Sequence, residues 1–114
     1  MEDCIFCKII NGDIPSSKVY EDDKIFAFND INPQTPVHIL IVPKEHICCA
    51  NAVTPVNAGV VAHIFTKISE IAEAAGIKDD GYRIINNCGK NGGQTVMHLH
   101  FHLLGGKDLG ERLV

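Results

Sequence analysis

The stretch His98-Leu99-His100-Phe101-His102-Leu103-Leu104 places three of the six histidines of this 114-residue chain in one short run. Side chains alternate faces along a β-strand, so the histidines share one face and the apolar residues between them share the other. The sequence therefore predicts a strand over residues 96–104 that packs on a core and presents a row of imidazoles. A surface strand that carries histidines by chance is the weaker interpretation, because histidine is rare and the alternation is strict.

Two chemistries suit such a row. Neutral imidazoles bind transition metals, or one imidazole acts as a nucleophile while its neighbours handle protons. The preceding loop, residues 89–95, contains three glycines, which let backbone N–H groups approach an anion closely. Gln94 and Thr95 end this loop and are expected to donate hydrogen bonds to phosphoryl oxygens. The loop therefore favours chemistry at phosphorus.

The other elements indicate a single α+β domain over residues 1–114. A short helix over residues 5–10 is expected, with Asp3 as its cap and Gly12 as its stop. A long helix is expected to begin at Thr54-Pro55 and to end at Gly76, with one apolar face over residues 60–75. The predicted strands, joined by short turns in an antiparallel sheet, are residues 18–21, 24–29, 37–42, 82–87 and 96–104.

Composition limits the class of partner. The chain has 46% hydrophobic residues, 21% charged residues and a net charge of −4, which is typical of a soluble protein. An acidic balance argues against broad binding to nucleic acid or to an anionic membrane. The acidic N-terminus lacks the features of a signal peptide, and no apolar stretch is long enough to span a bilayer, so we expect a cytoplasmic protein with reduced cysteines.

With these features together, the chain resembles the histidine triad (HIT) family of nucleotide-binding proteins. It is similar to the small branch that hydrolyses nucleoside phosphoramidates, whereas the transferase branch carries glutamine at the position of His102 and the DNA-repair branch adds a basic zinc finger. The resemblance implies a five-stranded antiparallel sheet with one long and one short helix, doubled by homodimerisation into one continuous sheet. The motifs that carry it are His-Leu-His-Phe-His-Leu-Leu, Ile5-Phe6-Cys7-Lys8-Ile9-Ile10, Phe28-Asn29-Asp30-Ile31, Pro36-Val37-His38, Pro43-Lys44-Glu45-His46 and Gly92-Gly93-Gln94-Thr95.

The resemblance also implies roles for single residues. His100 matches the nucleophile that attacks the α-phosphorus to give a nucleotidyl-histidine intermediate, and His102 matches the residue that contacts phosphate oxygens and protonates the leaving group. His38 matches a further histidine near the site, and Asp30 matches the carboxylate that binds the ribose hydroxyls. Asn87 and Thr95 match polar contacts around the phosphate, and the apolar residues that match the purine pocket are Ile5, Phe6, Ile9, Phe28 and Ile31. From local chemistry alone, Asp30 is a turn residue and the apolar residues are core.

Cys4 and Cys7 form a Cys-x-x-Cys pair, which can supply two of the four ligands of a tetrahedral metal site. Some bacterial members of the family that resemble this chain complete a zinc site with residues that match His46 and His98, so one structural zinc is expected, with no metal required for catalysis. The alternative is that both cysteines are reduced bystanders. The remaining cysteines, Cys48, Cys49 and Cys88, are interpreted as small buried apolar residues.

Three functions remain open at this point. The leading one is a hydrolase that cleaves a P–N or P–O bond at the α-phosphorus of a purine nucleoside phosphoramidate or related nucleotide. The second is a nucleotide-binding regulatory module in which catalysis is incidental, and the third treats the histidine row itself as a catalytic metal centre. An apolar base pocket selects purine shape, so adenosine and guanosine nucleotides are both expected to bind.

Overall fold

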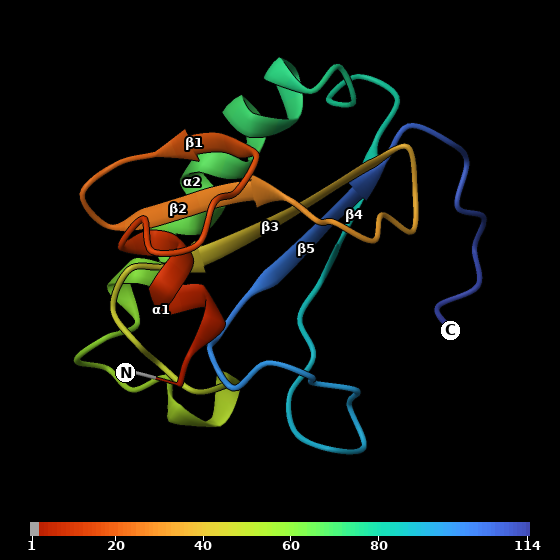
Figure 1. Cartoon of the computed structure of the whole chain (residues 1–114). Coiled ribbons are helices and arrows are strands. Elements are labelled where there is room, and N and C mark those ends of the chain that lie inside the picture. Colours follow the sequence, from red (N-terminus) through yellow and green to blue (C-terminus); the bar gives the residue numbers. More distant parts are fainter. Residues whose placement is uncertain (1–2) are drawn as a thin grey trace.

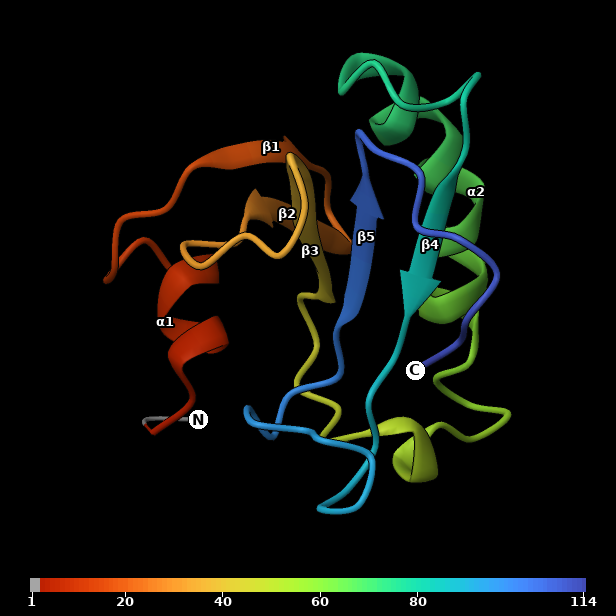
Figure 2. The same ribbon diagram turned by 90° about the vertical axis from the view of Figure 1, so that its right-hand side faces the viewer.

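The protein was analysed as a computed structural model that describes residues 3–114. Five strands form one antiparallel sheet in the order β1-β2-β3-β5-β4, and two α-helices lie on its opposite sides (Figures 1 and 2). The predicted α+β architecture, with one short and one long helix, is confirmed. The elements are α1 (Ile5–Ile10), β1 (Lys18–Glu21), β2 (Ile25–Asn29), β3 (Val37–Pro43), the 3₁₀ turn η1 (Ala50–Ala52), α2 (Gly59–Ala74), β4 (Tyr82–Ile85) and β5 (Phe101–Gly105).

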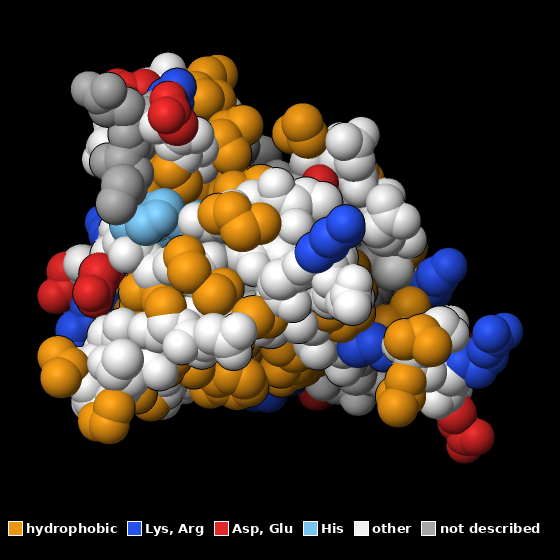
Figure 3. Space-filling model, turned by 90° about the horizontal axis from the view of Figure 1, so that it is seen from below, with side chains coloured by type: hydrophobic (Ala, Val, Ile, Leu, Met, Phe, Trp, Pro, Cys, Tyr) orange, Lys and Arg blue, Asp and Glu red, His pale blue; other side chains and the backbone are white. Residues whose placement is uncertain are grey.

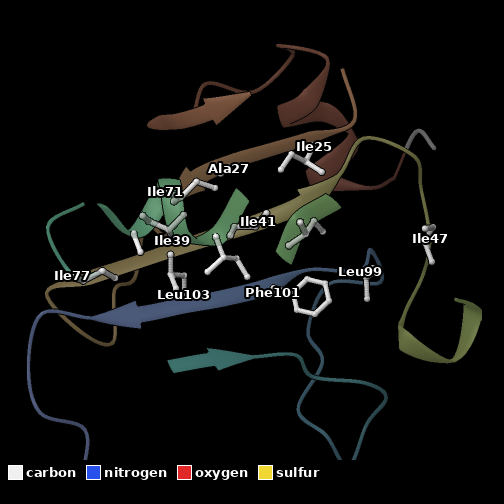
Figure 4. Packing of buried hydrophobic residues seen from close by; sticks show 13 residues of the cluster. Ile25, Ala27, Ile39, Ile41, Ile47, Ile71, Ile77, Leu99, Phe101 and Leu103 are labelled. Atoms are coloured by element: carbon white, nitrogen blue, oxygen red, sulfur yellow. The ribbon is translucent and has the colours of Figure 1, made fainter. Parts of the chain in front are cut away.

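The main core lies between the sheet and α2 (Figure 4). The side chains that point toward α2 are alternate residues of each central strand, such as Ile39 and Ile41 of β3, and they meet Ile64, Ile68 and Ile71 of the helix. Leu99, Phe101 and Leu103 belong to this core, so the apolar face predicted for the histidine run is confirmed. The histidines between them must therefore face the other side of the sheet.

A second, smaller core covers that other side. Phe6 and Ile9 of α1 pack there on the remaining alternate residues of β2 and β3, which are Phe26, Phe28, Leu40 and Val42. Because β3 is buried on both faces, its sequence reads as a continuous apolar run rather than an alternating one. The helix α1 thus covers the face of the sheet on which the triad histidines lie.

The last strand is shorter than predicted. It begins at Phe101 rather than at Val96, and it pairs with β3 from Ile41↔Phe101 to Val37↔Gly105. Continuing this register past Val42 and His100 would set Leu99 opposite Pro43, and proline has no N–H to donate to the ladder. The Leu99 N–H instead donates to the Ile47 carbonyl at 2.6 Å. The segment before Phe101 is therefore held by the chain that follows β3.

Two other boundaries differ from the prediction by more than one residue. The long helix begins at Gly59, because residues 54–58 form a preceding turn in which the Ala58 N–H donates to the Thr54 carbonyl at 2.8 Å. The strand β4 ends at Ile85 rather than at Asn87. The predicted helix stops are confirmed, since Gly12 and Gly76 follow the two helices with φ of 83° and 77°. Within residues 3–114, no helix combines the length and apolar character that a membrane crossing requires.

Candidate active site

The nucleophile predicted from the sequence, His100, lies just before β5 and beneath α1. Its side chain is buried, with 4% exposure, and its ring centroid lies 5.1 Å from that of Phe6. Its Nδ1 lies 2.7 Å from the carbonyl oxygen of His98. A carbonyl only accepts hydrogen bonds, so Nδ1 carries the proton and the lone pair of the neutral ring is on Nε2. The backbone therefore fixes which nitrogen of His100 is nucleophilic.

Two further histidines form a proton-donating chain beside it. The Gln34 N–H donates to Nδ1 of His38 at 3.0 Å, so the proton of neutral His38 is on Nε2. That Nε2 lies 2.8 Å from Nδ1 of His102 and donates to it. Because Nδ1 of His102 accepts, neutral His102 carries its proton on Nε2. The ring centroids of His100 and His102 are 5.2 Å apart, so a ring with a bare Nε2 and a ring with a protonated Nε2 are neighbours.

Burial keeps the rings of His38 and His102 neutral. Burial, with smaller contributions from the neighbouring His100 and His38, lowers the pKa of His102 to about 4. Burial also lowers the pKa of His38, although the Asp30 carboxylate opposes that effect. At neutral pH both rings are therefore uncharged hydrogen-bond donors through Nε2, and the Nε2–H of His102 is suited to donate to an anionic phosphoryl oxygen.

Asp30 joins this chain from the turn after β2. Its Oδ1 accepts the Asn32 N–H at 2.8 Å, so the turn role predicted from local chemistry is confirmed. Its Oδ2 lies 3.4 Å from Nε2 of His38. The carboxylate side chain keeps 20% exposure, which leaves it accessible to a ligand at the edge of the site.

Hydrogen bonds from the Gln94 side chain hold the glycine-rich loop, residues 89–95, in place. The Gln94 side chain is buried; its Nε2 donates to the carbonyls of Cys48 and Val96 at 2.7 and 3.0 Å, and its Oε1 accepts the Gly89 N–H at 2.9 Å. Both protons of the amide are thus used, and the expectation that Gln94 donates to a phosphoryl oxygen is corrected: it holds the loop. Asn87 donates to the Gly92 carbonyl at 2.6 Å, and Thr95 is exposed at the end of the loop.

The apolar residues predicted around the base divide into two groups. Phe6, Ile9 and Phe28 are buried in the core beneath α1, and the Phe6 and Phe28 rings meet edge to face at 5.6 Å. Ile5 and Ile31 are exposed, at 45% and 92%. The interpretation of all five residues as core is therefore wrong for Ile5 and for Ile31, and Ile31 lies almost entirely in solvent.

A candidate metal site adjoins the triad. The ligand atoms of Cys4, Cys7, His46 and His98 all lie within 4.8 Å of one another. Nδ1 of His98 lies 3.3 and 3.6 Å from the sulfurs of Cys4 and Cys7, and Nδ1 of His46 lies 3.4 Å from that of Cys7. Zinc bound tetrahedrally to thiolates and imidazoles sets sulfur and nitrogen about 3.6 Å apart. The residues present therefore fit a zinc ion.

The surroundings of these four residues also prepare them as ligands. Nε2 of His98 donates to the Pro43 carbonyl at 2.8 Å, so its Nδ1 keeps the lone pair that faces the two sulfurs. Cys4, and not Asp3 as predicted, caps α1, because its sulfur accepts the Cys7 N–H at 3.3 Å. Burial raises the pKa of the Cys7 thiol, and so does the adjacent Cys4; a bound cation reverses that effect by favouring the thiolate. One histidine reaches the surface on the face drawn in Figure 3.

The three triad histidines do not share one metal centre in the described part of the chain. His98 belongs to the cysteine cluster, whereas His102 belongs with Asp30 and His38 to a second candidate group. His100 belongs to neither group. The third function considered above, a catalytic metal held by the histidine row, therefore has no matching geometry.

Sequence reasoning missed the backbone groups that set the histidine protons. They are the Gln34 N–H and the carbonyls of Pro43 and His98, and every amino acid offers such groups, so no residue pattern reveals them. It also misplaced the three remaining cysteines. Cys48 is exposed and Cys49 and Cys88 are partly exposed, so the expectation that they are buried is wrong.

Comparisons with known proteins agree with this geometry. The HIT domain family model matches residues 11–109. Purine nucleoside phosphoramidase of Escherichia coli K12 is 48% identical over 112 residues, which are 98% of this chain and 94% of that protein. A HIT family hydrolase from Clostridium thermocellum superposes with a TM-score of 0.98 at 48% identity, covering 100% of this chain and 99% of the other. A histidine triad protein from Clostridium difficile gives 0.95 at 52% identity, covering 98% and 97%.

Proposed function

The chain belongs to the histidine triad family, and from that premise we propose that it hydrolyses purine nucleoside phosphoramidates at the α-phosphorus through a nucleotidyl-histidine intermediate. The observation that carries the proposal is the complementary protonation of two adjacent rings. His100 presents a bare Nε2, because its Nδ1–H binds the His98 carbonyl, and His102 presents a protonated Nε2, because its Nδ1 accepts from His38. A nucleophile that attacks phosphorus and a hydrogen-bond donor that stabilises the phosphoryl oxygens both favour displacement of an amine from phosphorus.

In the first step, Nε2 of His100 attacks the α-phosphorus and the P–N bond to the leaving amine breaks. The substrate enters with a proton on the leaving nitrogen, so that nitrogen departs as a neutral amine, and Nε2–H of His102 donates a hydrogen bond to the phosphoryl group as the bond breaks. In the second step, a water oxygen attacks phosphorus and the bond from phosphorus to His100 breaks, while one proton of the water stays on the monophosphate and the other passes to solvent. The products are the amine and the nucleoside monophosphate, and both histidines return to their starting forms.

The remaining groups position the reactants. His38 holds the ring of His102 by the bond between them at 2.8 Å, so that His102 offers Nε2 to the substrate. We infer that Asp30 binds the ribose hydroxyls, that Thr95 and Asn87 contact the phosphate region, and that the purine lies against the apolar residues of α1 and of the β2 end. Gln94 contributes indirectly, by fixing the loop on which Thr95 lies.

Asp30→Asn is expected to weaken binding of adenosine monophosphate about ten- to a hundredfold and to leave binding of inorganic phosphate nearly unchanged. Two ribose hydroxyls donate to one carboxylate, and a hydrogen bond to a charged group contributes about 1.5–3 kcal/mol. Asparagine keeps the Oδ1 that accepts the Asn32 N–H, so the turn survives the change. Calorimetric titration of both ligands measures the ratio, with Asp79→Asn as a surface control. An equal loss for both ligands would point to a collapsed loop instead.

We further propose that the protein is a cytoplasmic homodimer. The long helix carries Phe65 at 51% exposure, with its ring 5.8 Å from that of Phe101 in the core, so an apolar surface continues from the core to the outside. Sedimentation equilibrium at several concentrations is expected to give twice the mass of one chain. A monomer mass that does not change with concentration would contradict this.

The assay that tests the proposed function uses adenosine 5′-phosphoramidate, with and without a metal chelator. We expect release of adenosine monophosphate at a rate that the chelator does not abolish, because the reacting groups are imidazoles. Tight binding without turnover would favour the nucleotide-binding regulatory module. Turnover that stops with the chelator and returns with metal, in protein that remains folded, would favour metal catalysis.

A further inference from the structure

Two adjacent cysteines outside the active site and the metal cluster stand close together. Cys48 and Cys49 follow β3, and their sulfurs are 3.1 Å apart, with the Cys48 thiol donating to the Cys49 sulfur. Cys48 is exposed and Cys49 is partly exposed, so small reagents can reach the pair. Neither residue belongs to a candidate metal group of the described chain. The proposed hydrolysis does not use them.

The surroundings of Cys49 favour its thiolate. The hydrogen bond from Cys48 lowers the pKa of Cys49, and contacts with backbone N–H groups of Asn51 and Ala52 and with the Cys88 thiol act in the same direction, against a smaller effect of burial. Cys49 immediately precedes η1, and the Ala52 N–H donates to its carbonyl at 3.0 Å. An accessible thiolate beside a second thiol is the arrangement that redox-sensitive cysteines use.

We propose that Cys48 and Cys49 form a hydroperoxide-sensitive dithiol that closes to a vicinal disulfide. The Cys49 thiolate attacks the terminal oxygen of a hydroperoxide, the O–O bond breaks, and a sulfenic acid and an alkoxide or hydroxide form. The Cys48 thiol then attacks the Cys49 sulfur, and water leaves with the sulfenic oxygen. Two thiols lose two electrons and the hydroperoxide gains them. A disulfide bond is about 2.05 Å long, so the two sulfurs need to approach by only ~1 Å.

The pair is linked to the active site by backbone hydrogen bonds. The Cys48 carbonyl accepts the Gln94 amide at 2.7 Å, and the neighbouring Ile47 carbonyl accepts the Leu99 N–H at 2.6 Å. Closing the ring constrains the peptide that carries the first of these acceptors. The dithiol therefore lies where oxidation can act on the loop before the triad.

Tryptic mapping tests this without ambiguity, because cleavage after lysine and arginine separates the cysteines. Residues 45–67 contain Cys48 and Cys49 alone, residues 1–8 contain Cys4 and Cys7, and residues 84–90 contain Cys88. Protein carrying zinc is treated with hydrogen peroxide, its free thiols are alkylated, and the peptides are weighed. We expect peptide 45–67 to lose two hydrogens and to carry no alkyl group, and to regain two alkylation sites after treatment with a dithiol reductant.

Single variants test each role. Cys48→Ser is expected to accumulate a sulfenic acid on Cys49 that a cyclic dione traps, and Cys88→Ser is expected to form the disulfide as the wild type does. Peptide 45–67 that remains doubly alkylated after peroxide treatment would overturn the proposal. A disulfide joining peptide 45–67 to peptide 84–90, or loss of the disulfide in Cys88→Ser, would overturn it as well, because Cys88 would then be the resolving thiol.

Discussion

Replacing His100 with alanine is expected to lower turnover of a nucleoside phosphoramidate by more than about a hundredfold, since a missing nucleophile removes the covalent path altogether. The change deletes the only ring whose Nε2 is left bare by the His98 carbonyl among the triad histidines. Binding of nucleoside monophosphates should survive, because we assign affinity to the ribose and base contacts. Turnover and affinity are measured separately, by product release and by calorimetry.

His63→Ala is the matched control for this change. His63 lies on α2, on the opposite side of the sheet from the triad, and its Nε2 contacts Asp22 at 2.7 Å. Its loss removes an imidazole without touching the site, so turnover should stay close to that of the wild type. Should His100→Ala keep more than about a hundredth of wild-type turnover, the assignment of the nucleophile is wrong.

Purified without added metal, the protein is expected to contain one zinc per chain, and Cys4→Ser is expected to lose it. Serine still caps α1 well, so this variant keeps the hydrogen bond to the Cys7 N–H while removing a soft thiolate ligand. With zinc at about a thousand times its dissociation constant, binding contributes about 4 kcal/mol of stability, which corresponds to a fall of more than about 10 °C in Tm. Elemental analysis and thermal unfolding measure the two effects.

Two comparisons isolate the metal from other effects of substitution. Cys88→Ser removes a cysteine outside the cluster and should keep both the zinc and the Tm. Cys4→Ala removes the ligand and the helix cap together. Its free energy of unfolding should be about 1 kcal/mol below that of Cys4→Ser, and its Tm should be lower as well. Substoichiometric zinc and equal Tm in the wild type and Cys4→Ser would show that Cys4 and Cys7 are bystanders. The zinc is structural in this account, because four protein ligands fill its shell.

Periodicity alone predicted much of the fold. The alternation of histidine and apolar residues placed Leu99, Phe101 and Leu103 in the core, and the structure confirms it. The spacing of apolar residues from Val60 onward predicted the long helix, and glycines predicted both helix ends. These features depend on local sequence, so a single chain contains enough information to locate them.

Other features depend on what the chain meets in three dimensions. The shortened last strand results from Pro43, which lies opposite Leu99 only after β3 and β5 have paired. The Gln94 amide was predicted to bind phosphate, and it binds instead the carbonyl of Cys48, 46 positions away along the chain. The protonation pattern of the triad is set by backbone groups, which cannot be recognised from residue type, and by the contact of His102 with His38, which is 64 positions away along the chain.

The central claim is that Nε2 of His100 bonds to phosphorus, and the direct test is the mass of the intermediate. Wild-type protein is mixed with adenosine 5′-phosphoramidate, quenched in base to preserve the P–N bond, and digested. The account predicts that peptide 91–107, which contains all three triad histidines, gains one adenylyl group, and that fragmentation places it on His100 and not on His98 or His102. Turnover at the full wild-type rate with no adduct under rapid quenching, or an adduct on another histidine, would contradict it.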